Sequence, residues 1–320
     1  MYEQISSNRW RSVALIVVFV AFVMLIGYVF GRATGFGPWG LVIALVVAWA
    51  LAWGSYWYSD RIVLSMSRAR PVDKETEPYL VNTIEGLSLA AGLPVPQAYV
   101  IDDPAPNAFA TGRDPQHAAL AVTTGLLSMM DRLELEGVIA HELSHISNRD
   151  TLFMTLTAVL VGTVALMSDW MLHSWMFRRR DSGGDGQLQA IFFLIGIVLA
   201  LLSPLIAGLI QMAVSRKREY LADANGALLT RYPAGLAGAL RKIETDSHKL
   251  AVANKATASL WIANPLKDHN RRFDSLFDTH PPIEDRIQRL DEMAFEHGQG
   301  GPAGLDAGGQ AAAGAAATQA

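Results

Sequence analysis

Long stretches without a charged side chain limit the fold of this chain more than any other feature. Near its beginning, residues 12–31 and 33–59 are uncharged and mostly apolar. In a helix, about 20 such residues cross the hydrocarbon core of a bilayer. Composition agrees, because 51% of the residues are hydrophobic, 18% are charged and the mean hydropathy is +0.23, which exceeds the averages for soluble domains. We therefore expect a membrane protein.

The first stretch can also be read as the apolar core of a signal peptide. Such a core is shorter, and a cleavage site of small residues follows it. Residues 12–31 are long enough to span a membrane, so a retained helix is the better interpretation. With residues 33–59 it forms a predicted transmembrane hairpin over residues 1–59. Aromatic residues at the far end of the hairpin are expected among the head groups: Trp49, Trp53, Tyr56, Trp57 and Tyr58.

Two further apolar stretches, residues 151–168 and 188–215, predict a second hairpin over residues 151–215. Basic residues on both flanks of the first hairpin, and Arg216–Arg218 after the second, place these flanks in the cytoplasm. Arg178–Arg180, between the two later stretches, contradict that rule. Two crossings are therefore favoured, and a re-entrant hairpin that only dips into the membrane stays open.

The polar segments 60–150 and 216–293 are then the two parts of one cytoplasmic domain. The first part predicts an amphipathic helix over residues 75–91 and a short strand over residues 98–101. A strand pair over residues 107–112 and 118–124 should form a hairpin around a turn-like sequence.

The second part of the domain is mostly helical in pattern. Residues 294–320 are rich in Gly, Ala and Gln and have almost no large apolar residue. Such a tail cannot bury enough surface to offset its ordering entropy, so we expect it to be disordered.

The sequence His141-Glu142-Leu143-Ser144-His145 fits the pattern H-E-x-x-H. Asp131 and Glu134 predict a capping box at the start of its helix. Two histidines four residues apart lie on one helical face and can bind one metal ion, with Glu142 beside it. The chain has no cysteine, so a zinc site must use His, Asp and Glu. A zinc hydrolase needs a third protein ligand and an open position for water.

Glu219 is the candidate third ligand. It lies after the second apolar hairpin, and it can reach the two histidines only if that hairpin crosses the membrane twice or not at all. Asp223 follows four residues later on the same helical face and can hydrogen-bond the far nitrogen of a ligand histidine. Taken alone, Glu219 is more often a solvated charge on a helix.

Four motifs in this order resemble the HtpX family of bacterial membrane zinc metalloproteases, relatives of the endopeptidase that acts on prenylated CAAX proteins. The motifs are Asn107–Gly112; His141–His145 with Asn148, Arg149 and Asp150; Arg218–Tyr220 through Asp223; and Thr279–Pro282 with Arg286.

This resemblance implies that His141, His145 and Glu219 hold one zinc ion per chain and that Glu142 is the catalytic base. It also suggests His280 as a donor to the oxyanion that forms during catalysis. The alternative for His280 is a structural role at the start of the helix that follows.

The segment Asn107-Ala108-Phe109-Ala110 is predicted to be the exposed edge strand along which the substrate lies. Backbone pairing suits a protease, because every peptide offers the same donors and acceptors. The alternative is an ordinary edge strand protected by its turn.

Taken together, these patterns predict a mainly α membrane protein with four hydrophobic helices and a zincin-like α+β metalloprotease domain with a small sheet. The resemblance implies a multi-pass protein of the bacterial inner membrane, with a cytoplasmic active site, that degrades damaged or misassembled membrane proteins. The alternatives are a catalytically silent zinc-binding scaffold or chaperone and a hydrolase of lipids or small amides. A net charge of −4 and a pI near 6.1, with no basic face, argue against nucleic acid as a partner.

Overall fold

The computed structural model describes residues 2–33, 37–160, 162–163, 216–252, 257–265 and 281–296. Its helices are α1 (Tyr2–Ala33), α2 (Pro38–Met66), α3 (Pro78–Ala91), α4 (Thr124–Met129), α5 (Arg132–Ser147), a helix over Asp150–Leu160, α8 (Arg216–Thr230), α9 (Pro233–Thr245) and α10 (Ile283–Glu296). Its strands are β1 (Arg70–Pro71), β2 (Gln97–Ile101), β3 (Ala108–Gly112) and β4 (Ala118–Thr123).

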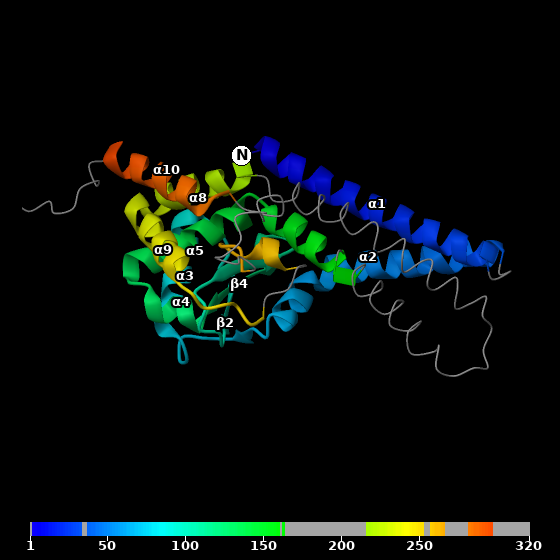
Figure 1. The fold of residues 1–320 in the computed structure, drawn as a ribbon, viewed down its shortest axis with the longest axis horizontal. Coiled ribbons are helices and arrows are strands. Elements are labelled where there is room, and N and C mark those ends of the chain that lie inside the picture. The colour runs from blue at the N-terminus through cyan, green and yellow to red at the C-terminus, as the bar shows by residue number, and fades with distance from the viewer. Residues whose placement is uncertain are drawn as a thin grey trace, which may run out of the picture.

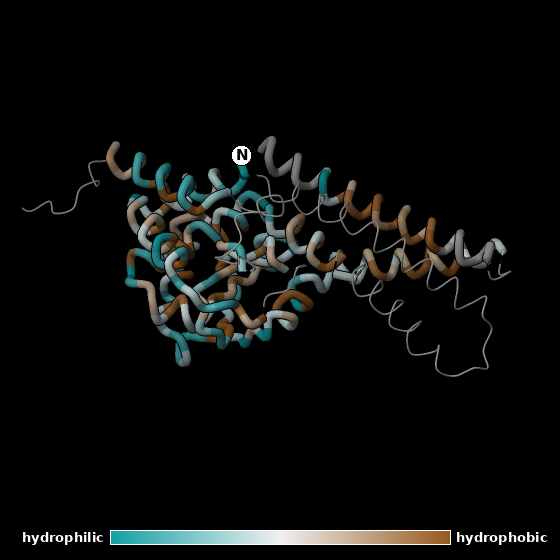
Figure 2. Tube along the Cα trace, viewed as in Figure 1, coloured by the Kyte–Doolittle hydropathy of each residue, from teal (hydrophilic) through white to brown (hydrophobic). Residues whose placement is uncertain are grey.

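Helices α1 and α2 pack along each other and extend away from the domain that holds the other labelled elements (Figure 1). Their extended parts are largely hydrophobic, as Figure 2 shows. Among the described residues, Pro38–Met66 is the one helix long and apolar enough to cross a membrane, and the apolar segments Trp10–Ile26 and Asp150–Leu160 are shorter. Four hydrophobic helices are thus not confirmed, and residues 188–215 and most of 151–168 lie outside the described residues.

A four-stranded sheet with the order β1-β2-β4-β3 forms the centre of the domain. The predicted hairpin is confirmed, because β3 and β4 pair antiparallel with Ala110 opposite Leu120. Strand β2 pairs parallel with β4. At the hairpin turn, Gly112 has a φ of 130°, and a Cβ there would lie 2.3 Å from the carbonyl oxygen of His117. Only glycine fits this position without strain.

The two faces of the sheet pack against different partners, because successive side chains of a strand point to opposite faces. On one face, alternate residues of β3 and β4, such as Ala110 and Leu120, join the cluster formed with α3, α5 and α9. On the other face, Phe109 and Ala121 pack with the end of α2, the helix Asp150–Leu160 and Trp261. The sheet therefore separates the packed helical domain from the base of the apolar helices.

Helix α5 lies at the centre of the helical layer and packs against α3, α8, α9 and β3. It begins with the predicted capping box, in which the side chain of Asp131 accepts from the backbone of Glu134 and the Glu134 side chain accepts from Asp131. Helix α8 approaches α5 closely at Gly226, where a Cβ would lie 3.1 Å from the backbone nitrogen of His141. This contact brings the side chains of the two helices together.

Candidate metal centre

Helix α5 carries both histidines of the H-E-x-x-H sequence on one buried face. The Nε2 atoms of His141 and His145 lie 3.2 Å apart, and the exposed fractions of the two residues are 0% and 5%. The i,i+4 spacing therefore gives the predicted geometry, with two imidazole nitrogens that face each other.

Helix α8 brings Glu219 to the same point. Its carboxylate oxygens lie 3.7 Å from Nε2 of His141 and 3.6 Å from Nε2 of His145. Two ligand atoms bound tetrahedrally to zinc at about 2.1 Å are roughly 3.4 Å apart. The three side chains thus fit a single ion. Within the part of the chain that the structure describes, they form a buried group of possible metal ligands.

Asp223 lies one turn after Glu219, behind His141. Its Oδ1 is 2.9 Å from Nδ1 of His141. A carboxylate only accepts hydrogen bonds, so Nδ1 carries the proton and the lone pair of Nε2 points toward His145 and Glu219. The structure therefore places Asp223 where the sequence predicted it.

Arg286 of α10 holds Asp223 in turn, and sequence reasoning gave it no role. Its guanidinium donates to the two oxygens of Asp223 at 2.9 and 2.7 Å and to the carbonyl oxygen of Ile262 at 2.9 Å. Arg286 is fully buried. Burial alone would raise the pKa of Asp223, but Arg286 and His141 lower it, so Asp223 stays a carboxylate. The motif with Thr279–Pro282 marks Arg286 in the sequence, but nothing local to it indicates a contact with Asp223.

Asp150 supports His145 as Asp223 supports His141, and the sequence analysis did not assign it this role. Its Oδ2 lies 3.2 Å from Nδ1 of His145. The chain turns sharply after α5, with Arg149 at φ 56°, and this turn directs Asp150 back to the histidine. Arg218 is buried and lies 3.6 Å from Asp150. Arg218 therefore lies beside Asp150 inside the domain, although it is not among the ligands.

Burial and neighbouring charges perturb the titration of this site. Burial raises the pKa of Glu142 to about 7, and the charge of Glu219 adds to this, while His145 and a hydrogen bond from the backbone of Ala110 oppose it. Burial acts to lower the pKa of His145, but the hydrogen bond to Asp150 and the charge of Glu219 outweigh it and raise that pKa to about 9. Burial lowers the pKa of His141. A general base is most effective when its pKa is near the working pH.

The predicted substrate strand is at the edge of the sheet, but it is not exposed. Asn107, Ala108, Phe109 and Ala110 are all buried. The chain itself covers one end, where the backbone N–H of Ile262 donates to the carbonyl oxygen of Ala108 at 2.9 Å. The prediction of an exposed edge was wrong, because a segment distant in sequence pairs with this strand.

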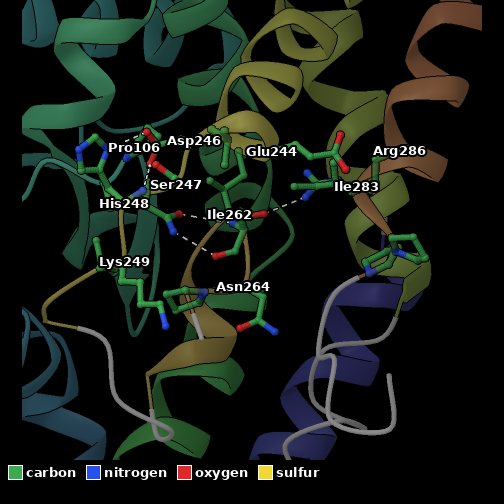
Figure 3. A pocket seen from close by; sticks show the side chains of 18 residues that line it. Pro106, Glu244, Asp246, Ser247, His248, Lys249, Ile262, Asn264, Ile283 and Arg286 are labelled. Carbon is green, nitrogen blue, oxygen red and sulfur yellow. Dashed lines mark hydrogen bonds and ion pairs between the residues drawn. The ribbon is translucent and has the colours of Figure 1, made fainter. Parts of the chain in front are cut away.

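His280 lies outside the described residues. The pocket in Figure 3 is close to the site without including the ligands. Its walls come from the loops after β2 and α9, from residues 262–265 and from the start of α10. Arg286 lines this pocket and also contacts Asp223, so it separates the pocket from the metal ligands.

Comparison with known proteins agrees with this geometry. The model of peptidase family M48 matches residues 74–294. A curated protein described as "Protease HtpX homolog", from Dictyoglomus thermophilum, is 46% identical over 292 residues, which are 91% of this chain and 94% of the relative. A protein of the same description from Thermoanaerobacter pseudethanolicus is 44% identical over 300 residues, which are 92% of this chain and 98% of the relative.

Among solved structures, the chain matches one titled "Crystal Structure of S. mikatae Ste24p". The sequences are 19% identical, the match covers 91% of this chain and 67% of the other, and the TM-score is 0.46. The two structures are thus only loosely similar.

Proposed function

The chain belongs to peptidase family M48 and is a membrane metalloendopeptidase, and on this premise we propose that it uses one zinc ion to cleave misfolded or damaged membrane proteins at the cytoplasmic face of the bacterial inner membrane. The observation that carries the proposal is the convergence of His141, His145 and Glu219 on one buried point, with Glu142 on the same helix. Zinc binding alone does not require Glu142.

The donor set favours zinc. Two imidazole nitrogens and one carboxylate are the ligands of many zinc peptidases, which keep a fourth position open. Asp223 and Asp150 each fix the tautomer of one ligand histidine and aim its Nε2. Neither imidazole then needs to reorganise when an ion enters.

When bound, the ion supplies Lewis acidity, which lowers the pKa of a coordinated water toward about 7 and polarises the substrate carbonyl. Glu142 takes the proton of the attacking water and later gives it to the leaving amine. Its burial and its raised pKa suit both tasks, because a carboxyl that titrates near neutrality can hold or release a proton at the working pH.

His280 is proposed to donate to the oxyanion, as the family resemblance implies. A change to Phe should lower kcat by about a hundredfold or more, the usual cost of losing one such donor, and leave the zinc content unchanged. Unaltered peptide cleavage by His280→Phe would refute this role.

The cytoplasmic side is proposed from the distribution of basic residues. Arg61, Arg68 and Arg70 follow the apolar part of α2, where the positive-inside rule expects the cytoplasm. The ligand helix α5 also leads, after two residues, into the apolar helix Asp150–Leu160. A site so close to the membrane favours substrates that are themselves in the membrane, which fits a role in the quality control of membrane proteins.

The test compares the wild type with Glu142→Gln in detergent, with casein as substrate and zinc content measured on both preparations. We expect the wild type to cleave casein, and the variant to keep its zinc and lose activity by at least about a hundredfold, the typical contribution of a general base. If both preparations hold zinc and neither cleaves protein, the scaffold interpretation replaces the protease.

A further inference from the structure

The backbone of β3 alternates between groups that face β4 and groups that face outward. Thr123 donates its backbone N–H to the carbonyl oxygen of Asn107, so the pair 107/123 is hydrogen-bonded. In an antiparallel pair such positions alternate with non-bonded ones. The backbone groups of Ala108, Ala110 and Gly112 therefore point away from β4, toward the side on which a further strand would pair.

One end of this outward edge is closed by the chain itself. The backbone N–H of Ile262 donates to the carbonyl oxygen of Ala108, and the side-chain amide of Asn107 donates to the carbonyl oxygen of Ala263 at 3.1 Å. Trp261 is fully buried and packs edge-on against Phe109, with ring centroids 4.8 Å apart. A segment fixed by a buried Trp is part of the core, so a substrate strand cannot extend past Ala108.

The next outward residue, Ala110, lies beside Glu142, the proposed catalytic base. The backbone N–H of Ala110 donates to the carboxylate of Glu142, and α5 packs against β3. From this point the outward edge runs from Ala110 toward Gly112 and the hairpin turn. Its residues are buried in this structure, so a substrate strand can pair here only by displacing what covers them.

The other end of the edge meets the membrane helix. Arg113 follows Gly112, and its guanidinium lies over the ring of Trp57 of α2, 4.7 Å from the centroid. Trp57 is 43% exposed and precedes the first charged residues of α2, Asp60 and Arg61, by one turn. A Trp in this position belongs to the head-group region, so the hairpin turn lies at the membrane surface.

Arg113 lies only three positions after Ala110, which is roughly 10 Å of extended chain. We infer that this edge of β3 takes the extended segment that directly adjoins a membrane span of the substrate, and that the enzyme cuts it within about three to five residues of the end of that span. The inference rests on the proposed endopeptidase function and narrows its substrates from membrane proteins in general to juxtamembrane segments.

The test uses the full-length protein with zinc in lipid vesicles, together with two single-span model substrates. One carries its tail after the span and the other before it, and each tail repeats one short peptide that the enzyme cuts in casein. Because every register then offers the same local sequence, mass spectrometry of the products reports distance alone. We expect the cuts to cluster within about three to five residues of the span.

A second pair of substrates carries a stable folded domain between the span and the repeats. Cleavage of these should fall at least tenfold, because the repeats no longer reach the edge strand at the membrane surface. Cuts spread evenly along both kinds of tail, with casein still cleaved, would overturn the inference and leave the endopeptidase intact. If neither casein nor any tail is cut by the zinc-loaded protein, the proposed function itself fails.

A variant separates the membrane contact from the chemistry. Arg113→Ala removes the contact with Trp57 and should broaden the distribution of cuts in the tails. Arg132→Ala, which removes an equally charged side chain at the start of α5, should leave the distribution narrow. An unchanged distribution in Arg113→Ala would show that the hairpin turn does not set the distance.

Discussion

The two halves of the metal centre are built in different ways. The α5 half is local, because His141, Glu142 and His145 lie within five residues on one capped helix. The half from α8 and α10 is assembled from distant parts of the chain, since Asp223 and Arg286 are 63 residues apart and bind each other through two hydrogen bonds. Both halves are fully buried.

This difference decides what holds each side chain in place. In α5, the helical repeat alone sets the distance between the two imidazoles. In α8, Glu219 reaches the ion only if the helix packs closely on α5, and Asp223 is fixed by an ion pair across the interface with α10. The second half should therefore be more sensitive to packing than the first.

The largest effect is expected from removing a ligand in either half. His145→Ala and Glu219→Ala should each lower zinc affinity by more than about a hundredfold, beyond the usual effect of a residue that only supports a ligand, and abolish cleavage. Calorimetric titration of zinc into chelator-treated protein measures this. Retention of zinc by Glu219→Ala would mean that the α8 half supplies no ligand.

Arg286→Met should show most clearly that the half from α8 and α10 depends on packing. It leaves Asp223 as a buried charge without its main partner, which costs roughly 3–5 kcal/mol of stability, and it releases His141, with a loss of about 10- to 100-fold in zinc affinity. Arg286→Lys should recover part of both. The measurements are thermal unfolding and zinc titration in detergent.

Arg289→Met is the matched control, because Arg289 lies on the same helix and is exposed, with its guanidinium over the ring of Tyr220. Its loss should cost no more than about 1 kcal/mol and leave zinc binding unchanged. Equal losses in the two variants would show that α10 acts as a whole and that the ion pair has no special part.

The sequence predicted the local half of this centre and several helices and strands outside the apolar stretches. The capping box of α5, helix α3 and the hairpin of β3 and β4 are confirmed because each depends on residues close together in the chain. It did not predict Arg286 or Asp150 as supports, because these contacts arise only when separate elements pack.

The edge strand shows the same limit. The turn-like sequence after it predicted a strand here, but pairing with Ile262 depends on a segment more than 150 residues away, and no local pattern reports that. The parallel pairing of β2 with β4 is likewise a property of the whole topology.

The titration of Glu142 gives a third test, within the local half. The folded pKa of about 7 lies above the ordinary value of 4.5. Between these two values the unfolded chain releases its proton while the folded chain keeps it, so the free energy of unfolding falls as pH rises and then levels off above pH 7. At 1.36 kcal/mol per pKa unit the loss is up to about 3 kcal/mol.

Chelator-treated wild type and Glu142→Gln should therefore unfold alike near pH 5, and the variant should be the more stable at pH 8. Thermal unfolding at both pH values checks this. A variant that shows the same dependence on pH as the wild type would assign the loss to another group, such as His145.

The smallest effect tests the packing that the distant half requires. Gly226 of α8 lies against the backbone of His141, and a Cβ there would come within 3.1 Å of its nitrogen. Gly226→Ala should push α8 away from α5 by a few tenths of an ångström, lower the free energy of unfolding by about 1–3 kcal/mol and weaken zinc binding through Glu219.

Gly86→Ala is the control, because Gly86 lies inside α3 with nothing within 4 Å of its Cβ position. That change should stabilise the protein by about 0.5–1 kcal/mol and leave zinc affinity unchanged. If Gly226→Ala behaves like Gly86→Ala in both measurements, the close approach of α8 and α5 does not position Glu219, and the contrast between the two halves fails.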